Sequence, residues 1–176
     1  ISVTTAVTDA AGNVSTSTNG GFSLDTTPPT LTVALAGDAD KTAAEVTSAS
    51  GVLSVTAEAG ALLSVVLTGQ SGAVTKALTG TGSAQAVVLT AGDLATLGDG
   101  AVTVSTTAID AAGNPANSSA GGFTIDTQGP TLAVTAGTDS DVTVSDAASG
   151  VLSVNAEAGA SVSVALTGAS GTVTKT

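Results

Sequence analysis

Hydrophobic and polar residues alternate with a period of two along most of this chain. The clearest case is the segment 101–109, in which Val102, Val104, Thr106 and Ala108 share one face and Thr103, Ser105, Thr107 and Ile109 share the other. Successive side chains of a β-strand point to opposite faces of the sheet. The pattern therefore predicts a strand whose valines face a core and whose threonines and serines face water.

Further segments of this kind are separated by clusters of Gly, Asp, Asn and Ser, which are typical of turns. Strands are predicted over residues 31–36, 52–57, 61–68, 73–78, 84–89, 101–109 and 122–126. An acidic polar loop is predicted over 37–50, and a single helical turn over 90–100 with Asp93 near its start. Seven short strands joined by such turns predict an all-β sandwich of the immunoglobulin type.

The chain is a tandem repeat with a period of about 100 residues. The sequence DAAGN begins at Asp9 and again at Asp110, 101 residues later, whereas GVLSV begins at Gly51 and again at Gly150, 99 residues later. The later copy therefore lacks two residues between Val134 and Gly150. Such a period matches the size of one independently folding domain.

The predicted fold class is thus a series of tandem immunoglobulin-like β-sandwich repeats. Residues 1–26 supply the last two strands of a preceding repeat, 27–127 form a complete repeat, and 128–176 supply the first four strands of a following repeat. Pro28, Pro29 and Pro130 mark the joints, because proline restricts the chain and donates no ladder hydrogen bond. We expect each partial repeat to be completed by a neighbouring repeat of the same chain or by a head-to-tail copy, because open sheet edges favour pairing.

The predicted core is built of small side chains. The chain has two Phe and no Trp, Tyr, Met or Cys, so Phe22 and Phe123 are its largest side chains, one per repeat. We interpret both as core residues, because buried aromatic rings dominate core energetics. The other core residues predicted for the complete repeat are Leu31, Val33, Leu53, Val55, Val65, Val88, Val102 and Val104.

The charge of the chain narrows the classes of partner. Fourteen acidic residues against three basic ones give a net charge of −11, which disfavours binding to nucleic acid or anionic lipid. No apolar run approaches the roughly 20 residues that a membrane-spanning helix needs, so no membrane insertion is expected. The chain has no His or Cys, and no Ser lies beside a base, so we predict no enzymatic activity. Cations are the expected partners.

Acidic residues are predicted to gather at the joints between repeats. In an immunoglobulin-like sandwich the end of one repeat meets the loops of the next, which places Asp25, Glu58 and Asp110 at the first joint and Asp126 and Glu157 at the second. Asp9 is the counterpart of Asp110 in the preceding repeat. Clustered carboxylates repel one another unless a cation neutralises them. Oxygen ligands on irregular loops favour Ca²⁺ over Mg²⁺, so the sequence predicts structural calcium at the joints.

The same residues also suit ordinary turns. Asp110 and Asn114 can bond the backbone of their own loop, and Glu58 can simply be solvated. A second acidic cluster, formed by Asp38 and Asp40 with the counterparts Asp139 and Asp141, is interpreted as a solvated turn. Positive φ angles are expected at Gly12, Gly60, Gly113 and Gly159.

Several short sequence motifs, taken in this order, resemble the bacterial immunoglobulin-like repeats of giant surface adhesins exported by type I secretion. They are DAAGN, the GGF strand, DTTPPT or DTQGPT, AEAG, and LATLGDGAVTV, and together they cover the whole chain. The resemblance implies an extracellular extender that holds a terminal ligand-binding domain away from the bacterial cell surface, with Ca²⁺ at the joints. By this resemblance the joint acids are Asp25, Glu58, Asp110, Asp126, Glu157 and Asp9.

Two departures from the repeat pattern concern the joints: Pro115 stands where the earlier copy has Val14, and Gly129 stands where it has Pro28. The adhesin spacer is one hypothesis for function. The alternative is a structural subunit of a surface layer or extracellular filament, in which the same domains make lateral contacts. A carbohydrate-binding module is disfavoured, because no Trp or Tyr is present to stack on sugars.

Overall fold

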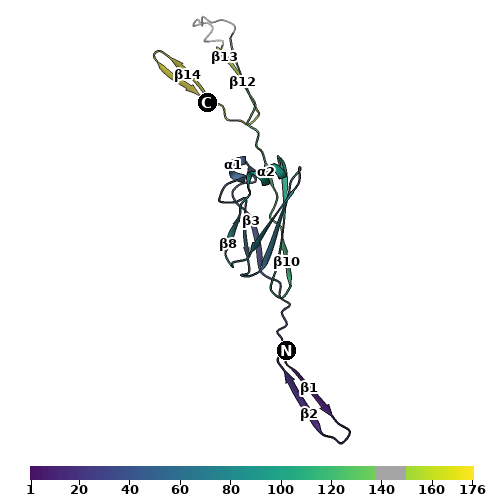
Figure 1. The fold of residues 1–176 in the computed structure, drawn as a ribbon. Helices are drawn as coiled ribbons and strands as arrows, with labels where there is room; N and C mark the ends of the chain where they lie inside the picture. The colour runs from purple at the N-terminus through teal and green to yellow at the C-terminus, as the bar shows by residue number, and fades with distance from the viewer. Residues whose placement is uncertain (138–149) are drawn as a thin grey trace. The chain divides into compact units, whose positions relative to one another are not determined.

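The computed structural model describes residues 1–137 and 150–176. It divides into two compact units, residues 1–127 and 128–176 (Figure 1). Unit 1 contains a complete sandwich from β3 to β11, preceded by the hairpin of β1 (Val3–Thr8) and β2 (Val14–Asn19). The predicted acidic pair Asp139 and Asp141 lies outside the described residues.

Two sheets pack together in the complete sandwich. The first has the order β3-β5-β8, with β3 at Leu31–Leu35, β5 at Leu53–Ala57 and β8 at Ala84–Val87. The second has the order β4-β11-β9-β6-β7, and β10 also pairs with β9. Its strands are β4 (Asp40–Lys41), β6 (Leu62–Thr68), β7 (Ala73–Thr79), β9 (Gly100–Ile109), β10 (Pro115–Ser118) and β11 (Phe123–Ile125). The predicted immunoglobulin-like all-β sandwich is confirmed.

The first strand of the sandwich is shared between the sheets. The segment β3 pairs antiparallel with β5, whereas β4 pairs parallel with β11, with Asp40 opposite Thr124 and Lys41 opposite Ile125. Two backbone hydrogen bonds flank this pairing: Thr124 N donates to Ala39 O at 2.7 Å, and Asp126 N donates to Lys41 O at 2.9 Å. The beginning and the end of the domain are therefore bonded directly to each other.

Strand alternation places the core as the sequence predicts. In β9, Val102, Val104, Thr106 and Ala108 are buried, whereas the threonines and serine between them are exposed or half-buried. Phe123 is 3% exposed and lies in the same core cluster as the buried residues of β5 and β6. One predicted core residue is wrong: Val88 is 41% exposed, and its neighbour Val87 is 1% exposed instead. Val87 lies opposite Leu53 in the register of β5 and β8, which fixes the inward face.

The segment predicted to be a polar loop contains regular structure. Besides β4 it holds the short helix α1 (Ala43–Val46), whose Val46 is fully buried. A capping box begins this helix, because Thr42 N donates to Glu45 Oε2 at 2.9 Å and Glu45 N donates to Thr42 Oγ1 at 3.4 Å. The predicted helical turn before β9 is α2 (Ala91–Leu97), which has a capping box of its own at Thr90 and Asp93. Both helices lie at the same end of the sandwich (Figure 1).

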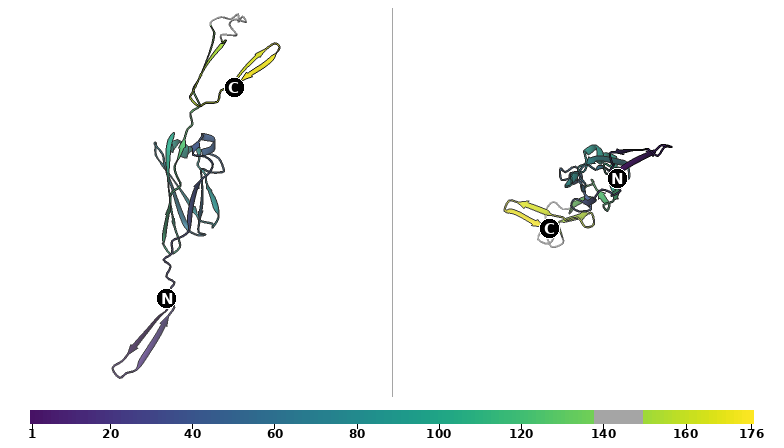
Figure 2. Two further views of the ribbon diagram at one scale, coloured as in Figure 1. Left: turned by 180° about the vertical axis from the view of Figure 1, so that it is seen from behind. Right: turned by 90° about the horizontal axis from the view of Figure 1, so that it is seen from below.

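Unit 2 contains the hairpin of β12 (Leu132–Ala136) and β13 (Leu152–Ala156) and the hairpin of β14 (Val164–Gly168) and β15 (Gly171–Lys175) among its described residues. Figure 2 shows these hairpins from two further directions. Each partial piece repeats a strand pair of the complete sandwich in the same register. The matching pairs are Thr8↔Val14 with Ile109↔Pro115, Leu132↔Ala156 with Leu31↔Ala57, and Val164↔Lys175 with Val65↔Lys76. The tandem repeat in the sequence is therefore also a repeat of structure.

Candidate functional site

The end of the sandwich at which the chain enters from residue 30 is called the N-terminal pole here. Glu58 N donates to Thr30 O at 3.1 Å, directly after the ladder position at which Leu31 lies opposite Ala57. Ile109, the last residue of β9, lies opposite Leu62, the first residue of β6. The corner 57–60 and the loop 110–114 are thus held at the same pole by the strands that precede them.

The DAAGN loop folds around the carboxylate of its first residue. Asp110 Oδ1 accepts hydrogen bonds from Ala112 N at 2.9 Å and Asn114 N at 2.8 Å, and Asp110 Oδ2 accepts one from Asn114 Nδ2 at 2.8 Å. The ladder closes behind the loop, because Asp110 N donates to Asn114 O at 3.2 Å. Gly113 has a φ of 94°, a conformation that favours glycine. The predicted positive φ angles at Gly12, Gly60 and Gly159 are also confirmed.

The loop at Asp9 has the same geometry. Asp9 Oδ1 accepts from Ala11 N at 2.9 Å and Asn13 N at 2.8 Å, and Asp9 Oδ2 accepts from Asn13 Nδ2 at 2.8 Å. The hydrogen bond from the Asn13 side chain lowers the pKa of Asp9 below its usual value, and Asn114 does the same for the pKa of Asp110. Hydrogen bonds to a carboxylate favour its charged form. Both loops therefore keep a negative charge over a wide pH range.

The joint before the complete sandwich contacts the DAAGN loop. Asn114 Nδ2 donates a second hydrogen bond, to Asp25 O at 3.3 Å, so this side chain links the loop to the incoming chain. The Asp25 carboxylate itself accepts a hydrogen bond from Thr27 N at 3.0 Å and so stabilises a turn before the prolines. The Glu58 side chain is exposed at the adjacent corner. The structure thus brings the segments of Asp25, Glu58 and Asp110 to one pole.

The other predicted site residues lie in equivalent places. In unit 2, Glu157 N donates to Thr131 O at 3.1 Å and Glu157 Oε2 accepts from Thr131 N at 3.3 Å. The first of these bonds has the same geometry as that between Glu58 and Thr30. Asp126 follows β11 at the end of the complete sandwich, where its backbone N–H binds Lys41 O. Asp126 and Glu157 belong to different compact units.

The ligand atoms available at the N-terminal pole are all oxygens. Within residues 1–137 and 150–176, no group of three or more acidic side chains is close enough together to hold a metal ion. The predicted calcium triad is therefore not assembled there. These residues match a calcium site in ligand type and in position. Ca²⁺ prefers hard oxygen ligands, and the pole offers the carboxylates of Asp25, Glu58 and Asp110, the Asp25 carbonyl and the Asn114 amide.

The opposite end of the sandwich, called the C-terminal pole here, holds the outgoing chain by a contact that the sequence analysis missed. Thr127 Oγ1 lies 2.9 Å and 3.0 Å from the two carboxylate oxygens of Asp99 and donates to this carboxylate. Asp99 follows α2, so this contact links the end of the helix to Thr127, two residues beyond β11. The sequence TLGDG around Asp99 is typical of a simple turn, so nothing in it indicated this contact.

Two ion pairs stand out among the described residues. Lys76 Nζ lies 2.6 Å from Asp93 Oδ2 and joins β7 to the start of α2. Lys41, whose side chain is buried, donates to Ala36 O at 2.7 Å and pairs with Asp38 Oδ1 at 3.4 Å. The Asp38 side chain is 72% exposed, in agreement with the solvated turn that was predicted for it, and it also pairs with this buried lysine. No described helix is long and apolar enough to span a membrane.

No protein-family model matches this chain. No curated protein matches it either. Among solved structures, the chain resembles a 1.5-MDa bacterial ice-binding adhesin at 20% identity and a TM-score of 0.45, covering 86% of this chain and 51% of that one. It also resembles a Ca²⁺-stabilized adhesin of an Antarctic bacterium that binds ice, at 28% identity and a TM-score of 0.37, covering 80% of this chain and 34% of that one. The chain thus spans about half of the first structure and a third of the second.

Proposed function

We propose that this chain is a spacer segment of a large bacterial cell-surface adhesin, and that its repeats separate a binding domain from the cell. The observation that carries this proposal is the exact recurrence of strand register between the complete sandwich and both partial pieces. Such repetition extends a chain by identical domains joined at short linkers. The anchoring of Asp25 to Asn114 at one pole and of Thr127 to Asp99 at the other supports joints of restricted motion.

The residue chemistry supports a structural role. The chain carries a net charge of −11 and has no His or Cys, so its composition is compatible with a spacer exposed to solvent. The hydrophobic cluster in the core consists of aliphatic side chains and Phe123, and the strands end in turns closed by backbone hydrogen bonds. These features suit a rigid structural domain.

Calcium at the joints belongs to the same proposal. Asp110 Oδ2 accepts one hydrogen bond among the described residues, from Asn114 Nδ2, and the Glu58 side chain is exposed at the same pole. A Ca²⁺ ion bound by these residues and Asp25 would neutralise their charge and hold the incoming linker against the sandwich. The repeat of the DAAGN geometry at Asp9 supports an equivalent site at the preceding joint.

The spacer proposal is tested by locating the chain on the bacterium that makes it. An antibody raised against residues 27–127 should label intact cells, and immunogold particles should lie at a distance from the outer surface. Deleting complete repeats from the parent protein should move a label on its distal end closer to the cell in proportion to the number removed. Labelling confined to broken cells, or a distal label whose distance does not change, would refute the proposal.

A further inference from the structure

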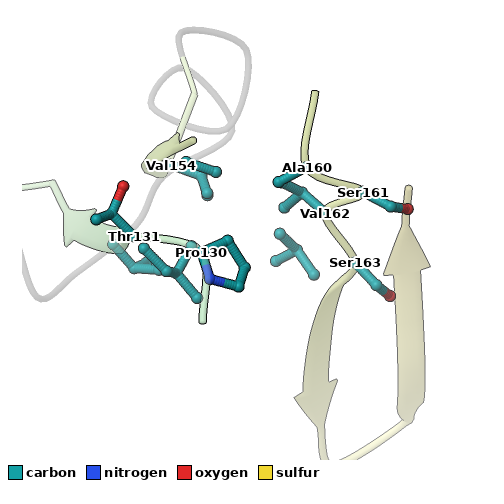
Figure 3. A pocket seen from close by; sticks show the side chains of 11 residues that line it. Pro130, Thr131, Val154, Ala160, Ser161, Val162 and Ser163 are labelled. Atoms are coloured by element: carbon teal, nitrogen blue, oxygen red, sulfur yellow. The ribbon is translucent and has the colours of Figure 1, made fainter. Parts of the chain in front are cut away.

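An open pocket lies between the two hairpins of unit 2 (Figure 3). Figure 3 shows Val154 on one side of it and Val162 on the other. Two residues of its lining, Val154 and Val164, are the counterparts, 99 positions later, of Val55 and Val65, which are buried in the complete sandwich. The pocket therefore represents the core of a partial repeat rather than a ligand site. The surface of the complete sandwich carries a different feature, on β10.

Two segments of the chain have the sequence Asn-x-Ser, in which x is not proline. The first is NVS, which begins at Asn13, and the second is NSS, which begins at Asn117. This sequence is the acceptor motif for attachment of a sugar to the asparagine side chain. Because so short a motif also arises by chance, the surroundings of each asparagine decide which of the two suits the reaction.

Asn117 presents its side chain at the surface of the complete sandwich. It is exposed and lies in β10 between Ala116 and Ser118, which are half-buried, so strand alternation directs it outward. Its Oδ1 accepts a hydrogen bond from Thr107 Oγ1, on the neighbouring strand β9, at 2.9 Å. No described residue accepts a hydrogen bond from its Nδ2. The amide is thus held through its oxygen, and its nitrogen is available at the surface.

Asn13 carries the same motif in a different environment. Its Nδ2 donates to Asp9 Oδ2 at 2.8 Å, and its backbone N–H donates to Asp9 Oδ1 at 2.8 Å. Hydrogen bonds to an ionised acceptor are stronger than those between neutral groups. A sugar on this nitrogen would crowd the Asp9 carboxylate and disturb the loop that folds around it. The geometry therefore favours modification of Asn117 and disfavours modification of Asn13.

The asparagine at position 117 is not a requirement of the fold. In the earlier copy of the repeat, 101 positions before, Thr16 and Ala6 stand where Asn117 and Thr107 stand, and they are partners in the same register. The strand pair therefore forms without the hydrogen bond between these two side chains. The asparagine of the DAAGN loop, in contrast, recurs as Asn114 with the same bonds. One asparagine thus repeats with the structure, whereas Asn117 is an addition to one repeat.

The position of β10 suits a bulky substituent. This strand pairs with β9, and no other described strand pairs with it. The connection that follows, residues 119–122, contains Gly121 and Gly122 and belongs to no strand, so the motif lies at the end of a short edge strand. A sugar at this place would hinder the addition of another strand to the edge, and natural sheets protect their edges by comparable means. Such protection is useful in a chain of closely similar repeats.

We propose that Asn117 is a glycosylation site, at which a sugar is joined to Nδ2. A bond forms between this nitrogen and the anomeric carbon of a sugar that is carried on a nucleotide or lipid diphosphate. The bond from that carbon to the phosphate oxygen breaks, and the diphosphate leaves with the bonding electrons. The amide nitrogen gives up one proton to a base of the transferase. Ser119 supplies the hydroxyl that completes the motif.

Mass spectrometry of the parent protein, purified from the bacterium that makes it, tests this proposal. Peptides that contain Asn117 should carry a sugar, and fragmentation that preserves the sugar should locate it on Asn117. Peptides that contain Asn13 should be unmodified. The proposal would be overturned by Asn117 without a sugar in every copy, by a sugar on Ser118 or Ser119 instead, or by equal modification of Asn13 and Asn117.

The mass of the adduct also identifies the donor. A nucleotide-linked donor adds sugars one at a time, so adducts with a single sugar are expected from it. A lipid-linked donor transfers a preassembled oligosaccharide in one step, so intermediates with fewer sugars should be absent. Either mass supports a sugar on Asn117.

Variants in the parent gene show whether the motif directs the reaction. Ser119→Ala should abolish the sugar although Asn117 and Thr107 remain, whereas Ser119→Thr should retain it, because the motif accepts either hydroxyl. Asn117→Gln should abolish the sugar, and Asn13→Gln is the matched control that should leave it unchanged. A sugar that persists in Ser119→Ala would refute recognition of the motif. None of these results depends on calcium or on the distance of the chain from the cell, so they are independent of the spacer proposal.

Discussion

Phe22 and Phe123 occupy the same position in successive repeats, yet Phe123 is 3% exposed and Phe22 is 55% exposed. Only Phe123 belongs to a complete sandwich, so only its ring is surrounded by the core cluster. Phe123→Ala should therefore reduce the free energy of unfolding by about 3 to 5 kcal/mol, since it leaves a large cavity. Denaturant unfolding of the 176-residue chain measures this change.

Phe22→Ala is the matched control for that measurement. It removes the same side chain from a position that is mostly exposed, so the main unfolding transition should shift by less than about 0.5 kcal/mol. Similar losses for the two variants would show that Phe123 is not the special core residue that its burial indicates.

Thr106 is a polar residue inside the core. Its Oγ1 atom is buried and makes no hydrogen bond to any described residue. A buried hydroxyl without a partner costs stability, whereas valine fills nearly the same volume. Thr106→Val should therefore stabilise the sandwich by about 1 kcal/mol in thermal or denaturant unfolding.

Thr5 is the control for Thr106, because it stands at the same position one repeat earlier but is exposed and donates to Ser17 O at 3.3 Å. Thr5→Val should leave the main unfolding transition unchanged. A destabilising effect of Thr106→Val would mean that its hydroxyl has a partner, such as a bound water, in solution.

The pair of Lys76 and Asp93 should make stability depend on pH in the acid range. The hydrogen bond from Lys76, followed by that from the Thr90 backbone, lowers the pKa of Asp93 from 3.8 to about 2. Because the folded-state value is depressed, the stabilisation is fully present above about pH 4 and is lost as pH falls from there through about 2. The pair and cap together contribute at most about 2 kcal/mol at neutral pH.

Unfolding measured at neutral pH and at several acidic values tests this dependence. Asp93→Asn should destabilise the sandwich at neutral pH, and its difference from wild type should shrink on acidification. Lys76→Met should weaken the same dependence while it keeps the bonds from Thr90 to Asp93. A difference between Asp93→Asn and wild type that is independent of pH would show that the ionised carboxylate is not what stabilises the start of α2.

Calcium should stabilise and extend the chain if the joint acids bind it. At a free concentration near 10⁻³ M and a dissociation constant of about 10⁻⁴ M, one site adds roughly 1.4 kcal/mol. Small-angle scattering and thermal unfolding should show a longer chain and a higher melting temperature with calcium than with a chelator. The Glu58→Ala, Asp110→Ala double variant should lose both responses.

Asp40→Ala serves as the control for these variants, because it removes an exposed carboxylate from β4 rather than from the N-terminal pole. It should respond to calcium like the wild type. If wild type and the double variant have the same length and melting temperature in both conditions, Asp110 and Glu58 act as turn residues and the calcium proposal is wrong.

Most strands could be predicted from alternation alone, and the exceptions have identifiable causes. In the run AVVL at residues 86–89, either Val87 or Val88 can face inward. Alternation alone does not decide between them, because the polar Gln85 shares a face with Val87. The register with Leu53 places Val87 in the core and leaves Gln85 half-buried. The strand β10 was missed because Pro115 and the small polar residues after it have low strand propensity.

The helices and the candidate site differ in how far the sequence alone predicts them. The capping box of Thr42 and Glu45 carries a recognisable S/T-x-x-E signature, so α1 could have been found within the acidic segment. The DAAGN loops could be placed at a pole from the strand order. The bonds of Asn114 to Asp25 and of Thr127 to Asp99 could not, because they join residues 89 and 28 positions apart through backbone geometry that no local pattern encodes.

The parallel pairing of β4 with β11 determines how the domain would respond to tension. A pull on both ends draws β4 toward the N-terminal pole and β11 toward the C-terminal pole, so the two strands slide past each other along their length. The hydrogen bonds from Thr124 to Ala39 and from Asp126 to Lys41 are then loaded together in shear rather than opened one after the other. This short parallel pairing would therefore resist stretching of the domain, and it would have to break before the rest of the sheet unfolds.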